Sequence, residues 1–246
     1  GCLAAWGCAL PFSVGCLIPA GTILIHARAR AELWADPALY KAAWNTVVVG
    51  SLAAFLTVTG GLLLVYGVRL SGRTLPRLLQ PITTIGYAAP GAVLAVGILL
   101  PLATFDNAMA DFVLGLTGFD PGLILTGSSF ALVLAYFVRF FAIGQGAADA
   151  ALERVSPSLS MAARSLGRRQ GQVLKEVYMP LIKGSVGSAL LLVFVDCVKE
   201  LPATLLLRPF NYDTLATRVH DQASLENLSD AAPAAIFIIV VSLFAV

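Results

Sequence analysis

The chain contains a series of apolar segments close to 20 residues long, and these constrain its fold more than any other feature. A run of about 20 apolar residues is the length that an α-helix needs to cross the hydrocarbon layer of a membrane. Only 12% of the 246 residues are charged, against about 25% in soluble domains. We therefore expect an all-α membrane protein, a six-span helical bundle, with spans at Cys2–Ile25, Trp44–Tyr66, Ile82–Thr104, Leu123–Ile143, Gly184–Leu207 and from Ala231 onward.

Both ends of the chain fall within apolar segments. Gly1 is preceded by neither a Met nor a basic region, so the first segment lacks the pattern of a signal peptide. The last segment reaches Val246 before it is long enough to span a membrane. We expect residues 1–246 to form one transmembrane domain that is truncated at both ends.

Basic residues are concentrated in two of the polar connections. The connections are Gly67–Gln80, with Arg69, Arg73 and Arg77, and Gly144–Lys183, with Arg154, Arg164, Arg168, Arg169, Lys175 and Lys183. The connection Phe105–Gly122 is instead acidic, with Asp106, Asp111 and Asp120. Because basic connections stay on the cytoplasmic side, the first two are predicted to be cytoplasmic.

The segment Ser156–Pro180 within the longer basic connection has the pattern of two short helices. Ser156 and Pro157 form a typical helix start, and Gly167 can end that helix in a left-handed conformation. Four small or apolar residues fall on one face at helical spacing: Leu159, Ala162, Ala163 and Leu166. A second helix is predicted over about 170–178. This pattern fits a helix lying on the membrane surface and equally a helix that docks on a partner.

The spacing in this segment resembles the EAA loop of ABC-transporter permeases. That pattern is Glu-Ala-Ala, three residues, Gly, nine residues and Ile-x-Leu-Pro, and the chain departs from it at Met161, where the family has Glu. The resemblance implies a cytoplasmic coupling loop within 144–183 that docks on separate ABC ATPase subunits. Its residues would be Ser156, Met161, Ala162, Ala163, Gly167, Val177, Met179 and Pro180.

Two further stretches, at 87–97 and 199–216, resemble permeases of the ferric-iron type. The resemblance implies a multi-pass permease subunit of a bacterial importer in the cytoplasmic (inner) membrane. An extracytoplasmic solute-binding protein would deliver ferric iron, and a second permease half, fused or separate, would complete the pathway. Thiamine, a polyamine or an anion remains an alternative solute, and a gradient-driven transporter is the alternative outside this class.

The third predicted span contains Pro90, Gly91 and Gly97, which favour a broken helix. Such a helix either lines a pathway or is a kinked helix that packs through small residues. Charged groups at membrane depth are costly and tend to pair. Lys199 can pair with Asp196, and Arg139 can pair with Glu200. These four residues either line the pathway or form a buried ion cluster.

Several classes of function have no support in the sequence. The chain has no Gly-x-x-x-x-Gly-Lys-Ser/Thr loop for nucleotide phosphates, so ATP is expected to be used by a partner subunit. The four cysteines and two histidines lack the spacing of a metal site. A net charge of +2 gives no indication of nucleic-acid binding. We expect a lipid-embedded transport subunit that is not an enzyme and binds no cofactor or metal.

Overall fold

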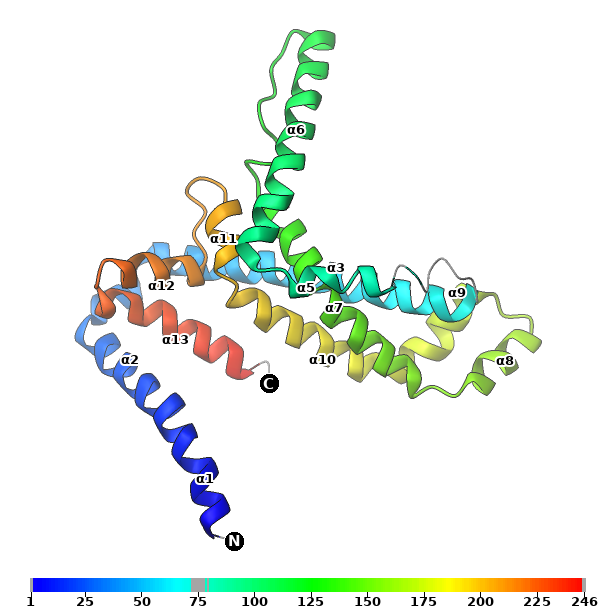
Figure 1. Cartoon of the computed structure of the whole chain (residues 1–246), viewed down its shortest axis with the longest axis horizontal. Helices are drawn as coiled ribbons and strands as arrows, with labels where there is room; N and C mark the ends of the chain where they lie inside the picture. The colour runs from blue at the N-terminus through cyan, green and yellow to red at the C-terminus, as the bar shows by residue number, and fades with distance from the viewer. Residues whose placement is uncertain (1, 72–77, 79, 245–246) are drawn as a thin grey trace. The chain divides into compact units, whose positions relative to one another are not determined.

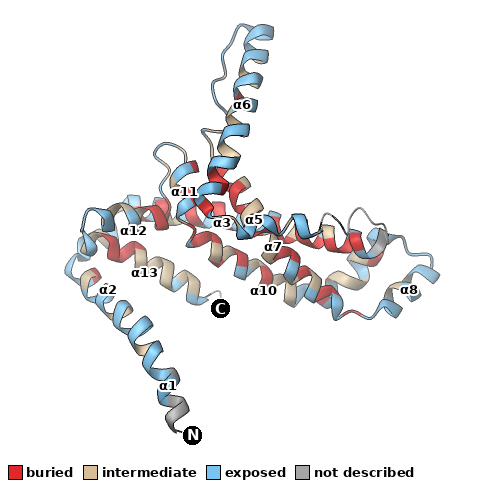
Figure 2. Cartoon of the chain, viewed as in Figure 1, coloured by how far each residue is buried: buried red, intermediate tan, exposed pale blue. Residues whose placement is uncertain are grey.

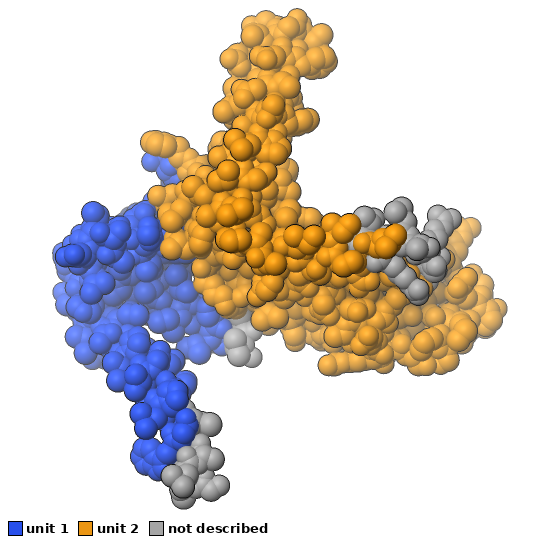
Figure 3. Space-filling model, in the orientation of Figure 1, with its two compact units in different colours: residues 1–47, 211–244 blue, residues 48–210, 245–246 orange. Residues whose placement is uncertain are grey.

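The computed structural model describes residues 2–71, 78 and 80–244, and this part of the chain is helical without strands (Figure 1). It forms two compact units, one of residues 1–47 and 211–244 and the other of residues 48–210 (Figure 3). Arg73 and Arg77 of the predicted cytoplasmic connection lie outside the described residues, as do both chain ends.

Five helical segments are long and apolar enough to cross a membrane. They are Ala9–Ala29, Pro37–Arg69, Gly91–Thr117, Ser129–Glu153 and Gln170–Val198. The sixth predicted span corresponds to the shorter apolar helix α13, Leu228–Phe244. The all-helical membrane class is therefore confirmed, with five candidate spans among the described residues.

The first unit contains both terminal parts of the chain. Its elements are α1 (Cys2–Phe12), a π-helical turn (Ser13–Leu17), α2 (Ile18–Ala29), a 3-10 turn (Ala31–Ala35), the start of α3 (Pro37–Ser71), α12 (Leu215–Ser224) and α13. Leu39, Leu215 and Ala234 form its small core. Asn45 donates to the carbonyl of Asp213 (2.9 Å), and Thr46 Oγ1 accepts from the N–H of Leu215 (2.9 Å). These bonds fix the start of α12 against α3.

The second unit contains the long helices around the segment Ser156–Pro180, which we call the coupling segment after its predicted role. Its elements are the rest of α3, α5 (Ile85–Ala88), α6 (Gly91–Thr117), α7 (Ser129–Glu153), α8 (Pro157–Ser165), α9 (Gln170–Val173), a π-helical turn (Leu174–Tyr178), α10 (Met179–Val198) and α11 (Pro202–Leu207). One cluster of buried residues lies where α3, α7 and α10 pack together, and others lie in α6 and α11 (Figure 2). A Cβ on Gly61 would lie 2.7 Å from the backbone of Gly144 and Gln145. The two helices therefore approach closely through glycine, as membrane helices often do.

The predicted bounds of the third span are wrong. The helix is broken at Ala89 and Pro90, which have extended backbones, and α6 then runs without interruption from Gly91 to Thr117. Proline disfavours a helical conformation in the residue before it, which accounts for the break. Gly97 lies within the continuous helix, so the interruption is confined to the residues around Pro90. The predicted acidic connection is also helical as far as Thr117.

The fourth and fifth spans also differ from their predicted bounds. Helix α7 begins at Ser129 and continues to Glu153, so residues 144–153 of the predicted coupling loop belong to a long helix. Helix α10 includes Pro180 in its first turn and ends at Val198, so residues 179–183 are also helical. Three residues, 199–201, separate α10 from α11. The span predicted over Gly184–Leu207 is therefore two helices.

Candidate functional site

Helix α8 begins and ends as the sequence predicts. Ser156 caps α8 by accepting the N–H of Ser158, and Pro157 is the first helical residue. Gly167 has a φ of 82°. Its N–H donates to the carbonyl oxygen of Arg164 (2.9 Å), and the N–H of Arg168 donates to the carbonyl oxygen of Ala163 (3.1 Å). These two bonds form a Schellman motif, which requires the left-handed residue that glycine supplies at lowest cost.

The apolar face of α8 is uncovered by the described chain. Leu159 and Leu166 are exposed, Leu166 by 82%. Ala162 is also exposed, whereas Ala163 is half-buried. At 3.6 residues per turn, Met161 lies on the opposite side of α8 from the two leucines, and it too is exposed. Residues on both sides of α8 are therefore free to meet a partner.

The second helix of the coupling segment is anchored to the bundle. The Tyr66 hydroxyl donates to the Gln170 carbonyl (2.7 Å), and the Tyr66 and Tyr178 rings meet edge to face at 5.5 Å. Arg168 forms an ion pair with Glu176 (3.2 Å). Val177 is half-buried, and Met179 packs on the core of the unit. Tyr66 was not among the predicted site residues, because its partner lies 104 residues away in the sequence.

An ion pair between the half-buried Arg139 and the buried Glu200 connects α7 with the break between α10 and α11. Arg139 Nε lies 3.0 Å from Glu200 Oε2, although its N–H makes no aligned hydrogen bond, and the side chain of Glu200 is only 7% exposed. Arg139 Nη1 donates to the Ala89 carbonyl (3.0 Å), and Glu200 Oε1 accepts the N–H of Ala203 (3.3 Å). The predicted pairing of these two charges is present.

The structure divides the four predicted charged residues into two ion pairs. Lys199 Nζ lies 2.7 Å from Asp196 Oδ1, as the i,i+3 spacing predicts. The Lys199 side chain is 60% exposed, so this pair is more exposed than the Arg139–Glu200 pair. The four residues therefore do not form one uniformly buried cluster.

Asp106 is a fully buried carboxylate in the middle of α6, at a position predicted to lie in an acidic connection. It accepts the N–H groups of Ile124 (3.1 Å), Leu125 (2.9 Å) and Thr126 (2.8 Å), and also the Thr126 hydroxyl (2.8 Å). It therefore fixes the segment that returns from α6 to α7. The sequence alone does not distinguish it from the exposed Asp111 in the same helix.

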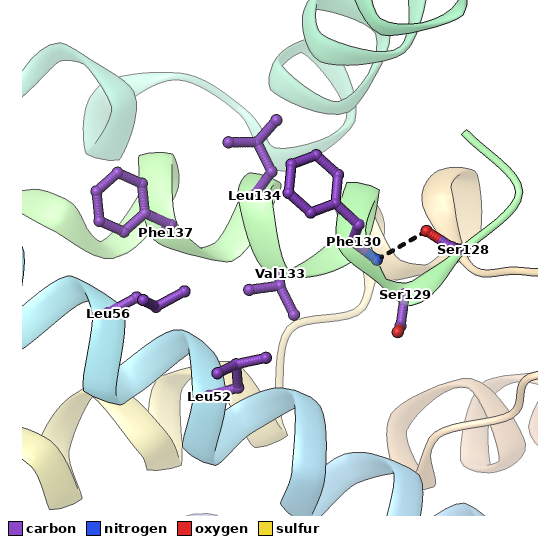
Figure 4. A pocket seen from close by; sticks show the side chains of 8 residues that line it. All are labelled: Leu52, Leu56, Ser128, Ser129, Phe130, Val133, Leu134 and Phe137. Carbon is purple, nitrogen blue, oxygen red and sulfur yellow. Dashed lines mark hydrogen bonds between the residues drawn. The ribbon is translucent and has the colours of Figure 1, made fainter. Parts of the chain in front are cut away.

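The pocket between α3 and α7 has a volume of about 450 Å³ (Figure 4). Its lining is apolar except for Ser128 and Ser129, and the Ser128 hydroxyl already accepts the N–H of Phe130. The lining offers no charged group to bind an ionic solute. Among the described residues, no group of three or more His, Cys, Asp or Glu is placed to hold a metal ion.

The chain has relatives among known transport proteins, although no protein-family model matches it. It is 26% identical over 198 residues to the Fe(3+)-transport system permease protein FbpB 2 of Haemophilus influenzae, covering 80% of this chain and 36% of the relative. It is 24% identical over 211 residues to the putative 2-aminoethylphosphonate transport system permease protein PhnV of Salmonella typhimurium, covering 84% and 73%.

A solved structure has the same fold. A chain of a bacterial alginate ABC transporter, crystallised with an alginate pentasaccharide-bound periplasmic protein, aligns with a TM-score of 0.75 over 99% of this chain and 92% of that chain, at 16% identity. The chain is homologous to permeases of binding-protein-dependent ABC transporters, FbpB 2 and PhnV among them. It is a multi-pass membrane protein. The chain spans 36% or less of the length of its ferric-transport relatives.

Proposed function

We propose that this permease is one half of the membrane pathway of an ATP-driven importer. The observation that carries the proposal is the coupling segment. Helix α8 is exposed and ends in a Schellman motif at Gly167, while the helix that follows is anchored through Tyr66. An exposed helix on a fixed base can dock on an ATPase and transmit its movement to the bundle.

Each predicted site residue has a proposed role in this mechanism. Ser156 and Gly167 define the length of the docking helix, and Ala162 and Ala163 allow a partner backbone to come close. Met161 replaces the family's Glu with an apolar contact to the ATPase. Val177, Met179 and Pro180 join the docking helix to α10, so that movement of the ATPases reorients that span.

The assembly that we propose has a second permease half, two ATPase subunits and an extracytoplasmic solute-binding protein. Its membrane part would contain six spans per half, with α13 as the sixth. The alginate transporter with the same fold was crystallised with a periplasmic protein, which supports the last of these partners. The coupling loop faces the cytoplasm in this proposal, in agreement with its basic residues.

We propose ferric iron as the solute. This proposal is supported by the similarity to FbpB 2 and by the resemblance of residues 199–216 to ferric-iron-type permeases. The similarity to PhnV favours 2-aminoethylphosphonate as the second candidate. The pocket between α3 and α7 has no charged group in its lining to hold either candidate, which agrees with delivery by a binding protein.

The test is purification of the complex from its native host membranes, followed by identification of its subunits and transport assays. We expect an ATPase to co-purify, and to be lost when Ala162 and Ala163 are replaced by Trp. Reconstituted vesicles with the binding protein should take up radioactive ferric iron in the presence of ATP. Uptake of 2-aminoethylphosphonate without uptake of ferric iron would show that the phosphonate is the solute. A complex without an ATPase would contradict the proposed function.

A further inference from the structure

Two interruptions of membrane helices meet at the Arg139–Glu200 ion pair. At the break between α5 and α6, Arg139 binds the Ala89 carbonyl (3.0 Å). At the break between α10 and α11, Glu200 binds the N–H of Ala203 (3.3 Å). Backbone groups that a broken helix leaves unpaired must find partners in the absence of water. One ion pair therefore satisfies backbone groups at both breaks.

The two partners of this pair stand on the helices that flank the coupling segment. Helix α7 carries Arg139 and ends at Glu153, just before α8. Helix α10 follows the coupling segment and ends two residues before Glu200. Its 20 residues extend about 30 Å at 1.5 Å per residue. A displacement of the coupling segment can therefore reach each charge along one long helix, Arg139 through α7 and Glu200 through α10.

The start of α6 fits tightly against the ion pair. A Cβ on Gly91 would lie 2.6 Å from Glu200 Oε1 and 3.1 Å from Arg139 Nη1. The carboxylate has little freedom to move aside, because Arg139 and the N–H of Ala203 both hold it. Movement of the pair is therefore passed directly to the first turn of α6.

We propose that Arg139 and Glu200 are positioning residues that make the two helix breaks bend together when the coupling segment moves. This inference rests on the proposed importer function. The pair sets the angle of α6 and α11 in each transport state, and it contacts neither ATP nor solute. A pair with a merely structural role would hold the helices together without affecting how they move.

Replacing both charges separates these two roles. Removing one partner leaves a buried charge unpaired and is strongly destabilising, whereas replacing both by apolar residues of similar volume is often neutral for stability. The double variant Arg139→Met/Glu200→Leu leaves no unpaired charge. It does leave the Ala89 carbonyl and the Ala203 N–H without these partners, at about 1–3 kcal/mol each, and we expect it to fold with lowered stability. Arg139→Lys is the second variant, because a lysine keeps the charge but lacks the planar fork that reaches Glu200 and Ala89 together. The control is Arg30→Met/Glu32→Leu, which removes a pair whose side chains are 49% and 66% exposed, together with the ion pair of Arg30 with Asp230.

The experiment uses the whole complex in lipid nanodiscs, with the four native cysteines replaced and spin labels at exposed positions Leu116 of α6 and Leu206 of α11. The distance between the labels is measured by pulsed electron resonance without nucleotide and after trapping with ATP and vanadate. ATPase stimulation by the binding protein is measured in parallel. We expect the parent and the control to change distance on trapping.

The double variant and Arg139→Lys should keep the ATPase bound but show no change of the label distance on trapping. Stimulation of the ATPase by the binding protein should fall about tenfold, within the usual range of coupling between sites. A distance change that persists in either variant would overturn the inference and leave the importer function intact. Failure of both variants to fold would also overturn it, because the pair would then be required for structure. A parent complex that binds no ATPase would refute the importer function itself.

Discussion

The Tyr66 hydroxyl in α3 donates a 2.7 Å hydrogen bond to the carbonyl oxygen of Gln170, the first residue of the second coupling helix. Tyr66 is itself buried in the core formed by α3, α7 and α10. The bond therefore connects the membrane bundle with the segment that we propose to dock on an ATPase.

Tyr66→Phe tests this connection. The variant keeps the ring contact with Tyr178 and removes the hydroxyl donor from the Gln170 carbonyl, which keeps only the N–H of Leu174. This loss should cost about 1 kcal/mol of stability. We expect normal insertion, faster amide exchange over residues 168–174 and reduced ATP-driven uptake. Tyr87→Phe is the control, because Tyr87 is an exposed residue of α5. Unchanged exchange over 168–174 would show that the hydroxyl does not anchor the segment.

Gly167→Ala tests the turn that ends α8. The left-handed backbone at φ 82° should make alanine unfavourable by about 1–2 kcal/mol, and the strained turn should lower uptake. Gly171→Ala is a matched control: this nearby glycine is helical, has open space where a Cβ would lie and should tolerate the methyl group. Equal uptake by the two variants in reconstituted vesicles would contradict the role of the turn.

Gly91→Ala tests the tight contact with the Arg139–Glu200 pair. The added methyl group must displace the Glu200 carboxylate, and overpacking of this kind typically costs about 1–3 kcal/mol. We expect a lower melting temperature of the detergent-solubilised protein. The same substitution at Gly115, also in α6 but with open space around it, should have little effect. A Gly91→Ala protein as stable as the Gly115→Ala protein would argue against the contact.

Asp106→Asn tests the carboxylate that holds residues 124–126. An amide has one oxygen in place of two, and its NH₂ group would face backbone N–H donors. Because hydrogen bonds to charged groups contribute about 1.5–3 kcal/mol each, a loss of at least about 2 kcal/mol is expected. Asp111→Asn, at an exposed position of the same helix, is the control. Comparison of the two melting temperatures decides the prediction, and similar values would refute it.

The stability of the first unit should depend on the protonation of Asp36 at acidic pH. Its carboxylate accepts the N–H of Ala38 (2.9 Å) and pairs with Arg218, and these interactions lower its pKa below the ordinary value. A lowered folded-state pKa means that the stabilisation is present above the unfolded value of about 3.9 and is lost as the pH falls through the folded value. Stability measured from pH 6 to pH 3 should decline less steeply in Asp36→Asn, and an identical profile would contradict the assignment.

The features that depend on nearby residues could be predicted from the sequence alone. The length of apolar runs indicated membrane helices, because the bilayer requires about 20 apolar residues whatever the rest of the fold. The start of α8 at Ser156 and its end at Gly167 follow from local backbone chemistry, and so does the Lys199–Asp196 pair. The register of Ala162, Ala163 and Gly167 also indicated the family. The functional roles of these residues stay predictions.

Which polar groups pair with partners far away in the sequence was decided instead by the tertiary structure. Asp106 was indistinguishable from a connection residue, because its partners lie 18–20 residues away and are backbone N–H groups that no composition reveals. The Arg139–Glu200 pairing was predicted, but its place at two helix breaks depends on how α5, α7 and α11 pack. The break before Gly91 follows from Pro90, whereas the full length of α6 and the separation of α11 from α10 were decided by the fold. Backbone groups freed within a membrane take their partners from whichever side chain the fold brings near.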